Sequence, residues 1–215
     1  MLLSGAFVAF QRVGVFVLYC YFCIKLGFMV AFLKNIRRRR RIKALEGSHI
    51  QVFPKVEELA NVALVWSAGS PEEVAQLDEV VSFFRSADLD ATIIVVEHGK
   101  AFKNKLAREE FASLCQEKNA VFIPKSQIKW YGYPKLEIVR QLFQERKFDA
   151  VISVCPVSNF TVEYIAAGLR SNFKTGMCEP QWCNFSFVLE KGGAILSVAE
   201  YLKALFEYMR KMSQH

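Results

Sequence analysis

The stretch "FDAVISVCPVSNFTVEYIAAGLRSNFKTGM", residues 148–177, indicates the fold class. Its first seven residues form an apolar, β-prone run typical of a buried strand. A short polar loop follows, then the helical pattern "TVEYIAAGLRS" and a second short strand "FKTGM". A strand, a helix and a strand in this order are typical of α/β proteins, many of which hold a ligand in such a loop.

The same alternation extends upstream. The segments "NVALVWSAG" (61–69) and "ATIIVVEHG" (91–99) are predicted strands, and "AVFIPKSQIKW" (120–130) contains a third. Amphipathic helices separate them, and the first begins at a predicted capping box formed by Ser70, Pro71 and Glu73. We therefore predict an α/β fold: an open, mainly parallel sheet with helices on both faces, a Rossmann-like three-layer sandwich. Its expected buried strand residues are Val65, Ile94, Val95, Val151 and Ile152.

The far edge of this sheet is predicted to be different. The segments "FKTGM" (173–177) and "FSFVLE" (185–190) are too close in sequence for a helical crossover. We therefore expect a mixed or irregular edge. The predicted organisation is a single α/β domain over 47–215, preceded by an apolar and basic helix within 1–46.

The net charge of +7 is concentrated in one segment. Arg37–Arg41, with Lys34 and Lys43 beside them, carry an excess of the same size. The rest of the chain is nearly neutral, and 53% hydrophobic residues supply a packed core. Since the basic residues accompany no recognised nucleic-acid module, we do not expect nucleic acid as a partner.

The apolar stretch over 13–33 permits two interpretations. It is long enough to cross a bilayer of about 30 Å, with Lys25 as its only charge, and the arginines after it would then face the cytoplasm. Alternatively, the protein begins at Met29 as a cytoplasmic chain with a short basic helix. That helix could contact an anionic membrane surface, or be fully solvated. The candidate membrane-contact residues are Phe32, Leu33, Ile36, Arg37, Arg38, Arg39, Arg40 and Arg41.

The six cysteines predict neither disulfides nor a metal site. Cys20 and Cys23 form a C-x-x-C within the apolar stretch, where small sulfur side chains pack well. Cys178 and Cys183 lack histidines at zinc-ligand spacing. We expect reduced thiols in a cytoplasmic domain, and no metal or cofactor.

The loops after the predicted strands are where such a sheet binds ligands. They contain neither G-x-G-x-x-G nor G-x-x-x-x-G-K-[ST]. Their ligand-binding candidates have bland alternatives: helix capping for Ser67 and Ser70, a solvated turn for His98 and Lys100, and aromatic padding for Tyr131. In the loop "CPVSNF", Ser158 and Asn159 are typical capping residues and Glu163 would repel an anion. We predict no catalytic residue.

The stretch 148–177, together with "FSFVLEKGGAILSVAEYLKALFEYM", resembles a family of uncharacterised bacterial proteins over roughly Met29 to the end. In that family a "DLLI-N" strand and an "F-P-x-x-Y-I-A-x-L-S-x-A-x-F-K-V-G" unit recur. Thr161 replaces its frequent proline, and Ser153 and Val154 replace a more polar strand end. The resemblance implies the Rossmann-like fold and no chemistry.

A fainter resemblance, in the "FD-x-x-I" strand and the helix and short strand after it, is to the N-terminal half of lipopolysaccharide heptosyltransferase-like glycosyltransferases. Those enzymes hold the sugar nucleotide mainly in a second Rossmann-like half, for which 215 residues leave no room.

These observations leave three functional hypotheses. The first is a non-catalytic interaction domain with an unknown protein partner, possible contact with an anionic membrane, and a place in the cytoplasm or at the inner membrane facing it. The second is a small glycosyltransferase-like enzyme or ligand-binding domain using the strand-end loops. Nucleic-acid binding is the third and is disfavoured.

Overall fold

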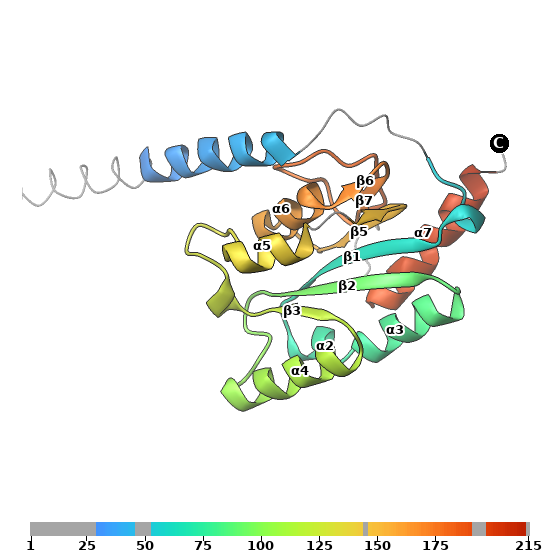
Figure 1. Cartoon of the computed structure of the whole chain (residues 1–215), viewed down its shortest axis with the longest axis horizontal. Coiled ribbons are helices and arrows are strands. Elements are labelled where there is room, and N and C mark those ends of the chain that lie inside the picture. The colour runs from blue at the N-terminus through green and yellow to red at the C-terminus, as the bar shows by residue number, and fades with distance from the viewer. Residues whose placement is uncertain (1–28, 46–52, 144–145, 191–196, 214–215) are drawn as a thin grey trace, which may run out of the picture. The chain divides into compact units, whose positions relative to one another are not determined.

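The computed structural model describes residues 29–45, 53–143, 146–190 and 197–213. The chain divides into two units, Met1–Arg41 and Ile42–His215. Residues 29–45 are helical. The second unit contains the α/β fold (Figure 1).

Strands and helices alternate through the second unit. Its elements are η1 (Val56–Glu58), β1 (Asn61–Ala68), α2 (Pro71–Val74), α3 (Leu77–Ser86), β2 (Asp90–Glu97), α4 (Lys105–Glu117), β3 (Val121–Ile123), η2 (Lys125–Gln127), α5 (Leu136–Leu142), β4 (Lys147–Phe148), β5 (Ala150–Val154), α6 (Phe160–Gly168), β6 (Arg170–Ser171), β7 (Lys174–Gly176), β8 (Phe187–Val188) and α7 (Val198–Met212).

The central sheet has six strands in the order β3-β2-β1-β5-β7-β8, and every neighbouring pair is parallel. A separate pair, β4 and β6, is also parallel. The chain winds from β1 outward to β3 and then returns to β5 on the other side of β1. The switch point, where Rossmann-like sheets bind ligands, therefore lies between β1 and β5.

Helices cover both faces of the sheet, as predicted (Figure 1). Alternation along β1 sends Leu64 and Trp66 into a core shared with α3, α4 and α7. Val65 points the other way, into a core with Val162 and Ile165 of α6 and with residues of α5. All five strand residues predicted to be buried are at most 1% exposed.

The far edge was predicted to be mixed or irregular, and the mixed alternative is wrong. Thr175 and Gly176 of β7 pair in parallel with Phe187 and Val188 of β8. The connection over 177–186 crosses from β7 to β8 without a helix. A short connection is sufficient because β8 has only two residues to align with β7.

The helix over 29–41 in the first unit exposes a row of apolar side chains. Met29, Phe32 and Leu33 are exposed and Ile36 is half-buried, at positions that share one helix face. Of the predicted membrane-contact arginines, Arg38 is half-buried and the other four are exposed. In the described part of the chain, no helix combines the length and apolarity needed to span a bilayer. The predicted anchor over 13–33 lies mostly outside those residues.

Candidate functional site

The carboxyl edge of the sheet is formed by the loops that follow β1, β2, β3 and β5. These strands are parallel, so their carboxyl ends lie at the same edge. Four of the five candidate ligand-binding residues lie in these loops, and Ser67 is the penultimate residue of β1. The strand ends of β1, β2 and β3 point to the left in Figure 1.

The loop after β1 is occupied by its own helix cap. Ser70 Oγ accepts from the Glu73 backbone N–H at 3.3 Å, and Glu73 Oε2 accepts from the backbone N–H groups of Gly69 and Ser70, which completes the predicted capping box. The carboxylate fills the position that a bound anion would take at a helix N-terminus. Ser70 therefore contributes to folding rather than to an anion cradle.

Glu97, the last residue of β2, forms a partly buried ion pair with Arg108 of α4. Glu97 is 3% exposed and accepts from Arg108 Nη2 at 2.8 Å and Nε at 3.0 Å, and from the Lys125 backbone N–H at 2.9 Å. The hydrogen bonds to this carboxylate raise the pKa of Arg108. Glu97 thereby joins α4 to the start of η2, and its carboxylate has no access to solvent for acid–base chemistry.

His98 and Lys100 lie on the solvent side of the same loop. The His98 ring Nδ1 is 3.1 Å from Asn159 Nδ2, so the ring turns toward the loop after β5 and away from the adjacent Glu97. Lys100 is exposed. The structure does not bring these side chains together around one point.

Tyr131 belongs to an aromatic cluster beneath the loop after β3. The centroid of its ring lies 5.3 Å from that of Trp130 and 5.2 Å from that of Tyr133. The Tyr133 ring in turn packs against Phe160 and Tyr164, with centroid distances of 4.9 and 5.0 Å. Thr161 Oγ1 donates to the Gly132 carbonyl at 2.8 Å and attaches this loop to α6. Most of these rings support the loop, whereas Trp130 remains 77% exposed.

The loop after β5 leads at the switch point into α6, whose first turn carries a buried carboxylate. Asn159 caps α6 by accepting from the Thr161 backbone N–H at 2.9 Å. Glu163 is 3% exposed and accepts from Ser158 Oγ at 2.5 Å and from the Trp182 backbone N–H at 2.7 Å. Its oxygens are thus engaged by protein donors.

Ser67 lies beneath that loop, next to a thiol. It is 4% exposed and forms a side-chain hydrogen bond with Cys155, whose Sγ donates to the Val157 carbonyl at 2.7 Å. Burial, foremost, raises the pKa of the Cys155 thiol. Because the thiolate is the reactive form, this pair does not form an activated nucleophile.

Direct contacts join the four loops to one another. Gly99 has φ +57°, and a Cβ there would lie 3.0 Å from the Gly69 carbonyl, so only glycine fits without strain. Lys125 Nζ donates to the Gly99 carbonyl. With the His98–Asn159 and Thr161–Gly132 contacts, these interactions give the edge a preformed, closely packed surface.

Exposed apolar side chains gather at this edge. Among the described residues of the second unit, the exposed large hydrophobic side chains are Phe53, Leu106, Trp130, Leu136, Val157, Tyr208 and Met212. Four of these seven, Leu106, Trp130, Leu136 and Val157, lie in the carboxyl-edge loops or at the first turns of the helices that follow them. We call these four residues, with the exposed Lys100, Lys129 and Lys135, the carboxyl-edge surface.

The roles of Arg108 and Cys155 and the burial of Glu163 were not predicted from the sequence. A basic residue in the first turn of α4, opposite a glutamate at a strand end, was a signal for the Glu97–Arg108 pair. Among the described residues, no cluster of three or more His, Cys, Asp or Glu side chains could hold a metal ion. The polar groups of the edge mostly bind one another.

A comparison with family models matches residues 34–212 to a family described as "Family of unknown function (DUF6913)". No curated protein matches the chain.

Proposed function

Because the chain belongs to the family of unknown function DUF6913, which brings no activity with it, we propose a function from geometry: an α/β domain that binds a partner protein through its carboxyl-edge surface. The observation that carries the proposal is the exposure of Trp130 and Val157, 77% and 74%, on loops fixed by mutual contacts. Single exposed apolar residues are ordinary, but several at one preformed edge are typical of an interface.

The charges of this surface favour an acidic partner. Lys100, Lys129 and Lys135 are exposed, and none has a carboxylate partner among the described residues. Lysines at the rim of an interface speed association with an acidic surface and add little affinity, whereas a central tryptophan contributes most of the binding energy. We therefore propose a protein with an apolar patch surrounded by carboxylates.

A binding role also explains why the ionisable groups of this edge are hydrogen-bonded to other protein groups. Glu73, Glu97 and Glu163 each accept hydrogen bonds from protein donors. Their carboxylates hold loops in place, which suits a rigid binding surface. An enzyme with its active site at this edge would need some of these groups free to face a substrate.

The experiment compares the recovery of proteins bound to the tagged full-length chain and to two matched variants. Trp130→Ser should reduce recovery of the partner at least about tenfold, as expected for a hot-spot residue. Met212→Ser removes another exposed apolar side chain (49%), which lies on α7, and should leave recovery unchanged. Equal recovery of the partner with both variants contradicts the proposal. Binding of the tagged chain to anionic vesicles alone, in place of a protein, contradicts it as well.

We also propose that the helix over 29–41 contacts an anionic membrane surface. The exposed Phe32 and Leu33 support this second role, because they share a helix face with Met29 and precede the arginine run. Apolar side chains would enter the interface while the arginines meet lipid phosphates. Such an attachment would concentrate the domain near partners at the membrane.

A further inference from the structure

The two-stranded sheet of β4 and β6 places two cations side by side. In its parallel register, Lys147 pairs with Arg170 and Phe148 pairs with Ser171. Phe148 and Ser171 are buried, whereas Lys147 and Arg170 are exposed and lie on the opposite side of the pair. Neighbouring strands are about 4.8 Å apart, so the two positive side chains begin close together.

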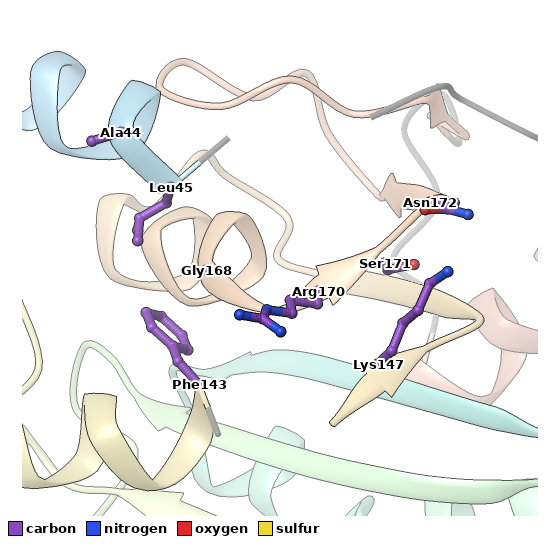
Figure 2. Close-up of a pocket in the computed structure, with 8 residues that line it drawn as sticks. All are labelled: Ala44, Leu45, Phe143, Lys147, Gly168, Arg170, Ser171 and Asn172. Atoms are coloured by element: carbon purple, nitrogen blue, oxygen red, sulfur yellow. The ribbon is translucent and has the colours of Figure 1, made fainter. Parts of the chain in front are cut away.

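No described carboxylate neutralises this cation pair. Among the residues that the structure describes, Asp149 is the acidic residue nearest to Lys147 in sequence, and its Oδ2 accepts from the backbone N–H groups of Ala60 and Asn61 at 2.9 and 2.8 Å. Asp90 is paired with Arg146 at 2.5 Å. Like charges on facing strand positions repel each other, and Figure 2 shows the two charged ends turned apart, Arg170 toward Phe143 and Lys147 toward Asn172. Both positive charges are therefore open to an anion.

The end of α6 does not explain the two cations either. A basic residue after a helix often binds its last carbonyls. Here Lys174 has that role, since its Nζ donates to the carbonyls of Ala166 and Ala167 at 2.9 and 2.7 Å. Lys147 and Arg170 are thus left for another use.

The cations border a cavity of about 460 Å³ (Figure 2). Asn172 adds an amide to its polar side, and Leu45, Phe143 and Gly168 form an apolar side. A Cβ on Gly168 would overlap the Phe143 ring, so the ring lies directly against the helix backbone. The volume falls within the range of small-molecule sites.

We propose that this cavity binds a phosphate monoester carried on an apolar body. A phosphate monoester has a charge of about −1.5 to −2 and three acceptor oxygens, which match two cations and one amide. Arginine binds phosphate through its planar fork and lysine binds it as a point charge. The apolar body would lie against Leu45 and Phe143. Its source is a membrane lipid or a free organic phosphate.

Octyl phosphate is the probe, titrated calorimetrically into the full-length chain. It should bind, and inorganic phosphate should bind at least about tenfold more weakly, because it leaves the apolar side empty. The double variant Lys147→Gln/Arg170→Gln should lose at least about tenfold in affinity, and Lys203→Gln, an exposed lysine on α7, should lose none. Lys147→Glu should abolish binding, since it replaces one of the two cations with an anion.

Protection of the unmodified chain provides an independent readout. Octyl phosphate should slow acetylation of Lys147 relative to Lys203, measured by mass spectrometry. Protection by phosphatidic acid vesicles, with none from phosphatidylcholine vesicles, would assign the ligand to the membrane; protection by octyl phosphate alone would assign it to solution. Equal acetylation of Lys147 with and without either phosphate, or affinity that survives the double variant, overturns the proposal.

Discussion

At the residue scale, the side chains of the carboxyl edge mostly satisfy one another. Ser70 and Glu73 close a capping box, and Glu97 holds Arg108 and the Lys125 backbone. A charged side chain in a buried site costs several kcal/mol unless paired, so each of these contacts is a condition for the loop to form. Polar residues at strand ends therefore need not indicate catalysis.

The capping boxes make a direct test at this scale. Ser70→Ala and Ser197→Ala should each lower the free energy of unfolding by about 1 kcal/mol, because each removes the acceptor for a backbone N–H at N3. Ser113→Ala is the control: its Oγ only donates to the Glu109 carbonyl within α4, so its effect should be close to zero. Urea unfolding measures all three.

The half-buried Cys178 predicts a pH dependence. Burial, and then nearby Cys155 and Glu163, raise the pKa of its thiol from 9.0 to about 11. Because the thiolate is the nucleophile and a raised pKa delays its formation, iodoacetamide labelling should keep rising about tenfold per pH unit from pH 8 to beyond pH 9. Peptide mass spectrometry resolves the site. A labelling rate that levels off near pH 9 would contradict the raised pKa.

At the element scale, the central strands define the fold. β1 lies between β2 and β5 and sends side chains into a separate core on each face. Ile152 in β5 is 1% exposed, and Val188 in the edge strand β8 is half-buried. The cost of truncating a strand residue should follow this difference.

Ile152→Ala should therefore lower the free energy of unfolding by about 2–5 kcal/mol, through lost burial and a residual cavity. Val188→Ala should cost clearly less. Denaturant titration measures both losses. If the slope of the unfolding free energy against denaturant concentration is unchanged, both losses arise in the native state. If the two substitutions cost the same, β5 would not be the central strand described here.

The elements also show what the sequence could predict. The long strands β1, β2 and β5 have continuous apolar runs and follow or precede helices with clear caps, so their existence and parallel orientation were predicted correctly. β4, β6 and β8 have two residues each, which is too short for any periodicity. No local pattern in the sequence could therefore predict the pairing of Lys147 with Arg170 or the parallel pairing of β8.

The candidate site was less predictable for a related reason. Glu163 was expected to repel an anion from the first turn of α6, but it is buried because the Trp182 backbone, 19 residues downstream, donates to it. Likewise, Gly99 in the loop after β2 lies against the backbone of Gly69 in the loop after β1. Contacts between loops depend on strand order, and residue types alone do not specify them.

At the scale of the whole molecule, three surfaces have separate proposed roles. The carboxyl-edge surface would bind a protein, the cavity beside β4 and β6 an organic phosphate, and the helix over 29–41 a membrane. None of these roles requires another, so each can fail alone.

The membrane role predicts a salt response in fractionated cells. Replacing Arg37–Arg41 with glutamine should shift the tagged chain from the membrane pellet toward the supernatant, by about 1 kcal/mol for each arginine near the surface. Phe32→Asp should act in the same direction and make the remaining binding more sensitive to salt. A distribution unchanged by both substitutions would exclude this helix as the membrane contact.

The most direct test of the carboxyl-edge interface is site-specific photo-crosslinking in living cells. A photoreactive phenylalanine would replace Val157, Leu106 or, as the control on α7, Met212 in the full-length chain. We expect one and the same acidic protein to crosslink at positions 157 and 106, not at 212, and the yield to fall when Lys100, Lys129 and Lys135 are changed to glutamate. Crosslinks absent from positions 157 and 106, or equally strong at 212, would contradict the proposed function.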